Sequence, residues 1–351
     1  MRKIGLVGTG LMGRHHWWAL DALRSAGLTD AVVTLAYDIN LASATQFSTE
    51  TGVAIAPDLD TLVAKSDIVW ICTWTAGHLQ TAAAAAAAGR PVFIEKPLAP
   101  NLNDCRTMAD VLRPVRHQVG LVMRHAPAYA IIAEEVASGR HGRPMGALFR
   151  DDQHFPIDGI YGSTWRSNVS AAGGGTLIEH SIHDIDILIW ILGTPETVSA
   201  QTTSFAGWPG IEDMAMVRMA FPNGHSAGLL SVWHRVKGRT TSRHLEVFCE
   251  DAVIWMDGEA GPVHIQTSTG IEVRQAPMPQ FLDLLPLAQL PETWRIAAAG
   301  LAIQAKAFLD DLSEGLSKGW PTVDDALIAH RVVDAAYQSA AAGGSTISYR
   351  G

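Results

Sequence analysis

The chain has 351 residues, of which 48% are hydrophobic and 17% charged, a composition typical of a globular protein long enough for two domains. Its net charge is −9 and its Lys and Arg residues form no cluster, which disfavours a nucleic-acid partner or an anionic membrane surface. No apolar run approaches the ~20 residues of a membrane helix, and the chain opens on a strand and a glycine turn. We therefore expect no cleaved leader and a cytoplasmic protein.

The three cysteines, Cys72, Cys105 and Cys249, are odd in number and far apart in the sequence. They show neither the spacing of a metal site nor that of a disulfide framework. Cys72 and Cys249 lie in apolar segments that resemble buried strands, where a thiol is usually inert.

The first third of the chain alternates predicted strands with predicted helices. Strands are expected at 3–8, 33–38, 66–73, 91–96 and 118–123, and helices at 11–26, 41–52, 77–90 and 101–113. Such alternation predicts an α/β domain with a parallel, doubly wound sheet over residues 1–122.

Beyond residue 123 the strands become longer and follow one another directly. They are expected at 145–152, 197–206, 213–234, 242–257 and 263–275, with a hairpin turn at Asn223-Gly224. Helices at 173–192, 293–315 and 323–340 are expected to cover one face, and 277–292 to form a long loop. The pattern predicts a second, α+β domain over 123–351 with a mostly antiparallel open sheet.

The segment "GLVGTGLMGRHH" carries the spacing Gly8-x-Gly10-x-x-Gly13 between a strand and a helix. In that context the spacing is a strong dinucleotide-binding signal, because the helix N-terminus offers N–H donors to a pyrophosphate. Asp38 ends the next long strand and would accept hydrogen bonds from the adenosine ribose. No cation follows it, only Ile39 and Asn40, so NAD is favoured over NADP.

Two further strand ends should lie near this cofactor. The third strand runs into "TWTAGH" and the fourth into Glu95-Lys96-Pro97. Because ligands of parallel sheets bind at the carboxyl ends of strands, these two ends should frame one crevice.

The segment "GGGTLIEHSIHDIDILIW" places ionisable side chains on an apolar helix. Helical periodicity puts Ile178, Ile182, Ile185, Ile189 and Leu192 on a core stripe, and Glu179, His183, Asp186 and Trp190 on a neighbouring one. Glu179 and His183 form an i, i+4 pair close enough to touch. Such a pair suits a zinc half-site, a proton-transfer pair or a solvated edge. A metal site would need a third ligand, which the pattern does not supply.

Taken together, these segments resemble the glucose–fructose oxidoreductase / inositol dehydrogenase (Gfo/Idh/MocA) family over essentially the whole chain. The resemblance is carried by "GLVGTGLMG", "TWTAGH", "AAAGRPVFIEKPLAPN", "ASGRHGRPMG", "STWR" and "GGGTLIEHSIHDIDILIWILG". It implies a Rossmann domain, an α+β domain and a substrate between them. Three departures stand out: Glu179 replaces a common aspartate, Trp74 a common proline, and His180-Ser181 the usual x-Gly.

The resemblance also implies roles by position. Lys96 matches the catalytic and substrate-binding lysine and His183 the catalytic histidine, so His183 would take the hydroxyl proton while Lys96 stabilises the developing alkoxide. Glu179 would orient the substrate or His183. The expected cofactor site comprises Gly8, Gly10, Leu11, Met12, Gly13, Asp38, Thr73, Trp74, His78, Glu95 and Lys96. The expected substrate site comprises Lys96, Arg124, Trp165, Arg166, Glu179 and His183, with no metal.

The sequence thus favours an NAD-dependent dehydrogenase of a sugar, inositol or related polyol, assembled as a homodimer or homotetramer. Two alternatives stay open: a non-catalytic NAD-binding regulator, and a glycoside-cleaving enzyme that uses NAD transiently. Asp184 and Asp186 are expected to make structural hydrogen bonds. The weaker site candidates are His154, Tyr161, His234 and Arg235.

Overall fold

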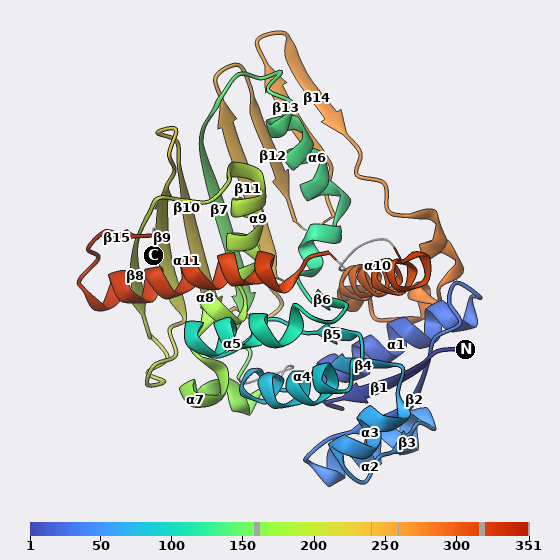
Figure 1. Cartoon of the computed structure of the whole chain (residues 1–351). Helices are drawn as coiled ribbons and strands as arrows, with labels where there is room; N and C mark the ends of the chain where they lie inside the picture. The colour runs from blue at the N-terminus through green and yellow to red at the C-terminus, as the bar shows by residue number, and fades with distance from the viewer. Residues whose placement is uncertain (158–161, 240, 259, 316–319, 350–351) are drawn as a thin grey trace. The chain divides into compact units, whose positions relative to one another are not determined.

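The computed structural model describes residues 1–157, 162–239, 241–258, 260–315 and 320–349 (Figure 1). They group into two compact units, each built on its own sheet. The first unit comprises Met1–Val122 and Pro279–Leu327, and the second comprises Met123–Met278 and Ile328–Gly351. Tyr161 lies outside the described residues.

The first unit contains a parallel sheet of six strands in the order β3-β2-β1-β4-β5-β6. The strands are β1 (Lys3–Val7), β2 (Val32–Tyr37), β3 (Ala54–Ile55), β4 (Ile68–Ile71), β5 (Val92–Ile94) and β6 (His117–Val119). The helices between them are α1 (Leu11–Ser25), α2 (Leu41–Thr51), α3 (Leu59–Lys65), α4 (His78–Ala87) and α5 (Leu102–Leu112). This confirms the predicted parallel sheet, while the short β3 and α3 were not predicted.

Three of these helices begin at side chains that cap them. Oxygens of Asn40, Asp58 and Asn101 accept hydrogen bonds from the backbone N–H three residues further on, at the starts of α2, α3 and α5. Each cap satisfies one N–H group that the helix itself leaves without a partner. The ends of these helices are therefore fixed by local sequence.

Residues 279–327 belong with the first unit, whereas the sequence analysis counted them with the second. Helix α10 (Glu292–Glu314) packs along α1, and its Phe308 meets the rings of Trp70 and Phe93. The Val119 N–H also donates to the carbonyl of Pro321 at 2.9 Å. The prediction that this helix covers the second sheet is wrong, because periodicity identifies an apolar face but not its partner.

The second unit contains a nine-stranded sheet in the order β14-β13-β12-β11-β7-β10-β9-β8-β15. Its strands are β7 (Pro144–His154), β8 (Thr197–Thr203), β9 (Met214–Ala220), β10 (Ser226–His234), β11 (Ser242–Cys249), β12 (Val253–Asp257), β13 (Val263–Thr267), β14 (Gly270–Arg274) and β15 (Ile347–Ser348). Only β7 and β10 pair in parallel. The predicted mostly antiparallel sheet is confirmed.

Helices lie across one face of this sheet (Figure 1). They are α6 (Pro127–Ala137), α8 (Thr176–Glu179), α9 (Ile182–Leu192) and α11 (Val323–Ala341), whereas the short α7 (Val169–Ala172) packs on residues Thr164–Ser167. Of these, α8 and α9 contact the central strands, and α6 contacts β12 and β13. Burial alternates strictly along β10 and β11, so every second side chain points to the other face.

The single helix predicted over 173–192 is two helices in the structure. Helix α8 ends at Glu179, α9 begins at Ile182, and His180 and Ser181 lie between them. Glu179 and His183 therefore lie on either side of a break, and the prediction of one continuous helix is wrong. The Ser181 hydroxyl contacts Asp151 Oδ2 at 2.7 Å and Ser231 Oγ at 2.6 Å, which anchors the break to the sheet.

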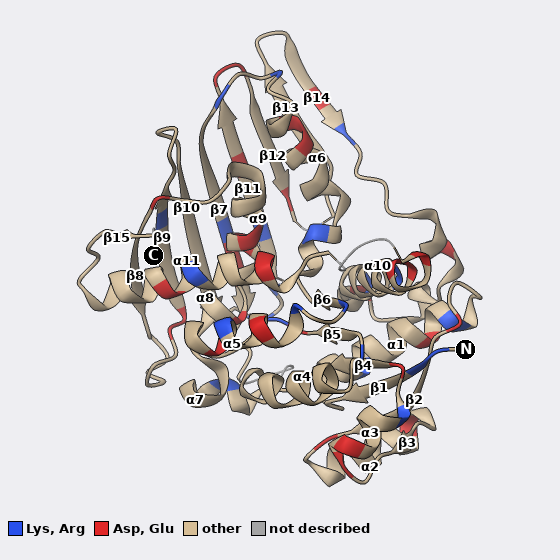
Figure 2. Cartoon of the chain, in the orientation of Figure 1, with Lys and Arg blue, Asp and Glu red and all other residues tan. Residues whose placement is uncertain are grey.

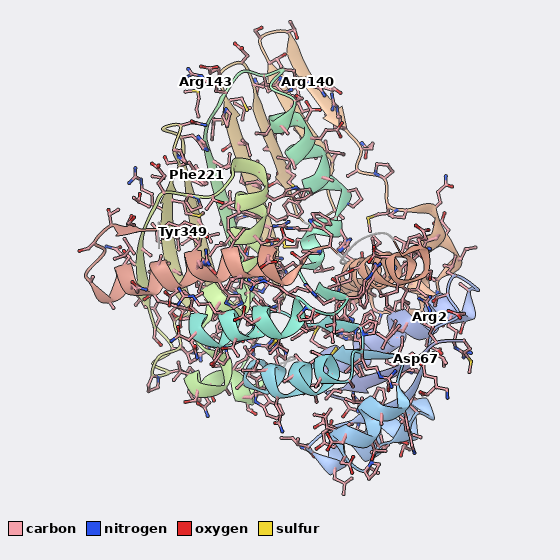
Figure 3. The ribbon with its side chains drawn as sticks, in the orientation of Figure 1. Arg2, Asp67, Arg140, Arg143, Phe221 and Tyr349 are labelled. Atoms are coloured by element: carbon pink, nitrogen blue, oxygen red, sulfur yellow. The ribbon has the colours of Figure 1, made fainter. Side chains whose placement is uncertain are left out.

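Positively and negatively charged residues are spread over both units and do not gather in one element (Figure 2). Arg140 and Arg143, labelled in Figure 3, stand between α6 and β7, where they pair with Glu135 and Glu250. Among the described residues, no helix is both long enough and apolar enough to cross a membrane.

Candidate functional site

The glycine turn between β1 and α1 leaves room for a ligand at one position. Gly8 has φ +93°, and a Cβ there would lie 2.5 Å from the carbonyl oxygen of Cys72. A Cβ at Gly13 would overlap the carbonyl of Gly8, whereas a Cβ at Gly10 would project into open space. Gly10 begins α1 without a side-chain cap, so its helix N-terminus fits a phosphate group.

Asp38 is held beside this turn by three hydrogen bonds. Its Oδ2 accepts from the Thr9 N–H at 2.7 Å and from Thr9 Oγ1 at 2.9 Å, and its Oδ1 accepts from the Asn40 N–H at 2.8 Å. The carboxylate therefore has a fixed orientation next to the turn, as ribose recognition requires.

His78 connects the ends of β4 and β5. Its Nε2 lies 3.1 Å from the Thr73 carbonyl oxygen and its Nδ1 lies 2.9 Å from that of Pro97. The side chain is buried, and burial lowers the pKa of His78, while the charge of Glu95 opposes that shift. His78 therefore joins two segments: the turn that contains Thr73 and Trp74, and the loop that contains Lys96.

Glu95 has a partner that the sequence analysis missed. Its Oε1 lies 2.8 Å from Nε2 of His16, and its Oε2 accepts from the Lys96 N–H at 3.1 Å. Burial alone would raise the pKa of Glu95, but the hydrogen bond and charge of His16, with the charge of Lys96, bring it below the usual range. The only signal of this contact in the sequence was a polar residue, His16, at a buried position of α1.

Sterics in the second unit explain two of the three glycines before α8, and the third, Gly173, has φ +89°. A Cβ at Gly175 would lie 2.6 Å from the backbone nitrogen of Glu212, and one at Gly174 would lie 2.9 Å from Cζ of Tyr337. The Glu212 carboxylate accepts from the N–H groups of Gly175 and Leu177 and from the Tyr337 hydroxyl. Burial raises the pKa of Glu212, while these hydrogen bonds oppose the shift. Together these contacts fix the start of α8.

Glu179, at the end of α8, is buried and paired with Arg166. The Arg166 Nε donates to Oε2 of Glu179 at 2.9 Å, and its guanidinium carbon lies 4.4 Å from the ring centre of Trp165. The structure thus brings together three of the predicted substrate-binding residues, Trp165, Arg166 and Glu179.

His183 lies in the first turn of α9 and is 7% exposed. One turn later, Asp186 accepts two hydrogen bonds from Arg124, from Nε at 2.8 Å and from Nη2 at 2.7 Å. The Arg124 guanidinium also lies 5.9 Å from the ring centre of Trp190. Arg124, expected to bind substrate, thus also holds α9 through Asp186.

A second buried ionic cluster lies beneath the break between α8 and α9. Arg243 Nε donates to Asp184 at 2.8 Å and lies 3.5 Å from Asp151, which is 3.1 Å from Nε2 of His180. Burial raises the pKa of Asp184 well above its usual range, with Arg243 opposing and Asp151 adding to the shift. Although burial also acts on Asp151, the charges of Arg243 and His180 hold its pKa well below the usual range. The cluster anchors α9 to β7 and β11.

The weaker candidates lie near the carboxyl ends of β7 and β10. His154 Nδ1 is 3.2 Å from the Phe155 carbonyl oxygen, His234 Nε2 is 3.3 Å from Asp152, and Arg235 lies 4.8 Å from the ring centre of Phe155. Within the described part of the chain, no group of three or more His, Cys, Asp or Glu residues could hold a metal ion.

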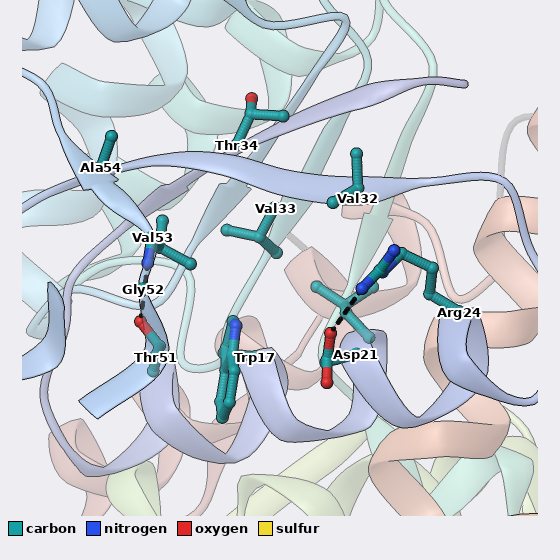
Figure 4. A pocket seen from close by; sticks show the side chains of 11 residues that line it. Trp17, Asp21, Arg24, Val32, Val33, Thr34, Thr51, Gly52, Val53 and Ala54 are labelled. Atoms are coloured by element: carbon teal, nitrogen blue, oxygen red, sulfur yellow. Dashed lines mark hydrogen bonds and ion pairs between the residues drawn. The ribbon is translucent and has the colours of Figure 1, made fainter. Parts of the chain in front are cut away.

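Neither of two hollows described in the first unit is lined by a predicted site residue. One, of about 260 Å³, lies beside Trp17, Val32 and Gly52, at the amino end of β2 and thus away from Asp38 (Figure 4). The other, of about 170 Å³, is lined by His15, Trp18, Leu290, Pro291, Trp294, Ala297 and Ala298.

Comparison with known families agrees with this geometry. Residues 2–121 match the GFO_IDH_MocA family, described as an oxidoreductase family with an NAD-binding Rossmann fold. Residues 129–255 match the GFO/IDH/MocA C-terminal domain.

Individual relatives and structures are more distant. The chain is 29% identical to 1,5-anhydro-D-fructose reductase of Ensifer adhaerens over 64% of this chain and 67% of the relative. It is 32% identical to inositol 2-dehydrogenase of Cereibacter sphaeroides (strain ATCC 17029 / ATH 2.4.9) over 57% of this chain, and that match spans only 56% of the relative. A structure of levoglucosan dehydrogenase with NADH and levoglucosan superposes with a TM-score of 0.84 and 21% identity, covering 99% and 98% of the two chains.

Proposed function

Because the chain belongs to the GFO/IDH/MocA oxidoreductase family, we propose that it oxidises a secondary alcohol or anomeric hydroxyl of a sugar, inositol or related polyol, with NAD as the hydride acceptor. One observation in the first unit carries the proposal. Lys96 follows β5 at the same carboxyl edge of the sheet as the glycine turn after β1, with only β4 between the two strands. A cation is thereby placed near a dinucleotide turn.

The first unit binds the cofactor, and NAD supplies a nicotinamide that accepts hydride from carbon. The N–H groups at the start of α1 bind the pyrophosphate, and Asp38 accepts hydrogen bonds from the adenosine ribose. The same carboxylate repels a 2′-phosphate, which supports NAD over NADP.

In this proposal two side chains, His183 and Lys96, act on the substrate hydroxyl. His183 takes its proton as a general base, since an imidazole titrates near neutrality. Lys96, as an ammonium, donates a hydrogen bond to the same oxygen and stabilises its developing negative charge. Glu179 and Arg166 orient the substrate.

Charge pairing in the second unit supports an uncharged substrate. Arg166 is paired with Glu179, and Arg124 with Asp186. Neither arginine therefore offers an uncompensated charge to a carboxylate or phosphate on the substrate. The Trp165 indole provides an apolar face of the kind that packs on the C–H face of a sugar ring.

We also propose a homodimer or homotetramer that covers the helix-free face of the nine-stranded sheet. This face carries Leu148 and Met216, which are 57% and 47% exposed. Leu230 pairs with Met216 across β10 and β9, and Phe248 extends the apolar surface on β11. A second copy would remove these side chains from water.

The proposal is tested by a panel of sugars, inositols and other polyols assayed for NADH formation at 340 nm, with NAD and then NADP. Stoichiometric NADH release with one class of neutral polyol is expected, and Lys96→Ala should abolish it. Tight NAD binding without turnover would indicate a regulator. Glycoside cleavage without net NADH would indicate transient use of the cofactor.

A further inference from the structure

The sequence assigned Glu95 to the cofactor site, yet both of its carboxylate oxygens contact the protein. Oε1 contacts His16 and Oε2 accepts the Lys96 N–H. The residue is 5% exposed. A carboxylate that is buried as well as engaged in this way is a poor ligand for a ribose hydroxyl, unlike the partly exposed Asp38, so its role lies in the protein itself.

The carboxylate is enclosed by three separate parts of the first unit. His16 approaches from α1, Lys96 from the loop after β5, and Gly120 from the residue after β6. A Cβ on Gly120 would lie 2.7 Å from Oε1 of Glu95 and 2.9 Å from its Cδ. Only a glycine therefore permits the observed position of the carboxylate.

His16 is fixed in a single orientation. Its ring centre lies 5.0 Å from that of Phe93 and 5.8 Å from that of Trp70, and the side chain is fully buried. Nδ1 has no hydrogen-bond partner among the described residues. Since an ionised carboxylate only accepts hydrogen bonds, Nε2 must carry the hydrogen that faces Glu95.

The titratable groups around Glu95 indicate which reactive residue its carboxylate positions. The groups that face it are His16 on α1, Cys72 after β4, His78 on α4 and Lys96 beside it. Burial, with the charge of Glu95, raises the pKa of the Cys72 thiol well above its usual range, so Cys72 stays uncharged. Lys96 is the one reactive group whose backbone the carboxylate holds.

We propose that Glu95 and His16 are positioning residues: the carboxylate, fixed by His16 and by the space at Gly120, sets the backbone position from which Lys96 reaches the substrate. This inference rests on the proposed function only for the catalytic role of Lys96. Cofactor affinity does not depend on Glu95 in this arrangement, which separates the proposal from a ribose-binding role.

A pair of matched variants tests the role of His16. The amide nitrogen of glutamine reaches about as far from Cβ as Nε2 of histidine, whereas that of asparagine reaches only the place of Nδ1. His16→Gln should therefore keep most of the turnover, while His16→Asn should lower it about ten- to a hundredfold. The Kd for NAD should stay within about threefold in both.

Glu95→Leu tests the other side of the contact. Leucine is close to glutamate in size but has no acceptor, so the His16 ring and the Lys96 N–H both lose their partner. Gly120→Ala should displace the Glu95 carboxylate, because the added Cβ would occupy the space beside it. Both variants should lose turnover about as much as His16→Asn while NAD affinity is kept. Glu135→Gln, which alters a buried, ion-paired carboxylate in the second unit, is the matched control for lost stability.

A measurement independent of activity completes the test. In protein labelled with 15N-lysine, the Lys96 amide signal is identified by its loss in Lys96→Arg. It should move upfield in Glu95→Leu and Gly120→Ala and stay in place in Glu135→Gln. An unmoved signal, or NAD affinity lost tenfold with turnover kept, overturns the proposal. If the signal moves but no polyol is oxidised, the positioning role stands and the proposed function fails.

Discussion

Arg166 lies between an indole and a carboxylate: its Nε donates to Glu179 Oε2 at 2.9 Å, and its guanidinium lies 4.4 Å from the ring centre of Trp165. Glu179 is 3% exposed, and this arginine is an ion-pair partner of its carboxylate. Breaking an ion pair that includes a buried carboxylate is costly.

Glu179→Ala should therefore raise the KM for substrate about tenfold or more, because Arg166 loses the acceptor that orients it. Glu179→Asp should cost less, since it keeps the charge and shortens the side chain by one methylene. Initial rates over a substrate titration measure both. A KM that is unchanged in Glu179→Ala would contradict the orienting role.

His183→Ala should lower turnover about 100-fold or more, the usual scale for losing general-base assistance. Wild-type activity should rise with pH through a limb near neutrality, and that limb should be absent in the variant. NAD affinity should change little, because the proposed phosphate site is at the start of α1 in the first unit.

The His183 variant must first be shown to be folded by its thermal melt, since Ile182 and Ile185 beside it are buried core residues. Near-normal turnover of a folded His183→Ala protein would assign the base elsewhere, most plausibly to Lys96.

NAD should bind at least several-fold more tightly than NADP, because the carboxylate of Asp38 is fixed by Thr9 and Asn40 and repels a 2′-phosphate. Asp38→Ser should reduce this preference. Thr9→Val, which removes one hydrogen bond to Asp38 and keeps the charge, should preserve it. Fluorescence titration with both nucleotides measures the ratio, and equal affinity in the wild type would contradict the assignment.

His15 should make stability depend on pH. Burial, with the charge of His16, lowers the pKa of His15 to about 4 from its usual 6.5. Above pH 6.5 the ring is neutral in both states; between pH 6.5 and 4 only the unfolded chain gains the proton, so stability falls as pH decreases.

In His15→Phe this contribution is absent, and the loss of melting temperature between pH 7 and 5 should be smaller than in the wild type. An equal loss in both proteins would show that burial does not hold His15 neutral.

The open face of the second sheet should mediate self-association. Leu148→Asp should lower the mass measured by light scattering at micromolar concentration, because it places a charge in the proposed interface. Ile39→Asp, at a residue that is 68% exposed in the first unit, is the control and should leave the mass unchanged. A wild-type monomer would refute the assembly.

The parts of the fold that sequence predicts are those set by short segments. The spacing Gly8-x-Gly10-x-x-Gly13 and the strand that ends before Asp38 each encode their own geometry. The break at His180 and Ser181 was not predicted, because its cause is Asp151 and Ser231 on two distant strands.

The candidate site shows the same limit of local sequence. Motifs identified Lys96, His183 and Glu179, but not the ion pairs that hold the segments around them. His16 and Glu95 are 79 residues apart, and Arg243 and Asp184 are 59 apart, so nothing local in the sequence joins them. Helix propensity and periodicity likewise gave no reason to place α10 against α1.

That placement of α10 has a consequence for biosynthesis. The first unit is completed only by residues 279–327. Every strand of the nine-stranded sheet except β15 is therefore synthesised before Phe308 can cover Trp70 and Phe93. Translation proceeds at about 5–20 residues per second, so this aromatic surface stays exposed for roughly ten seconds or more after β5 is made. During that interval the emerging chain presents a binding surface for chaperones, and a truncation after residue 122 would make the exposure permanent.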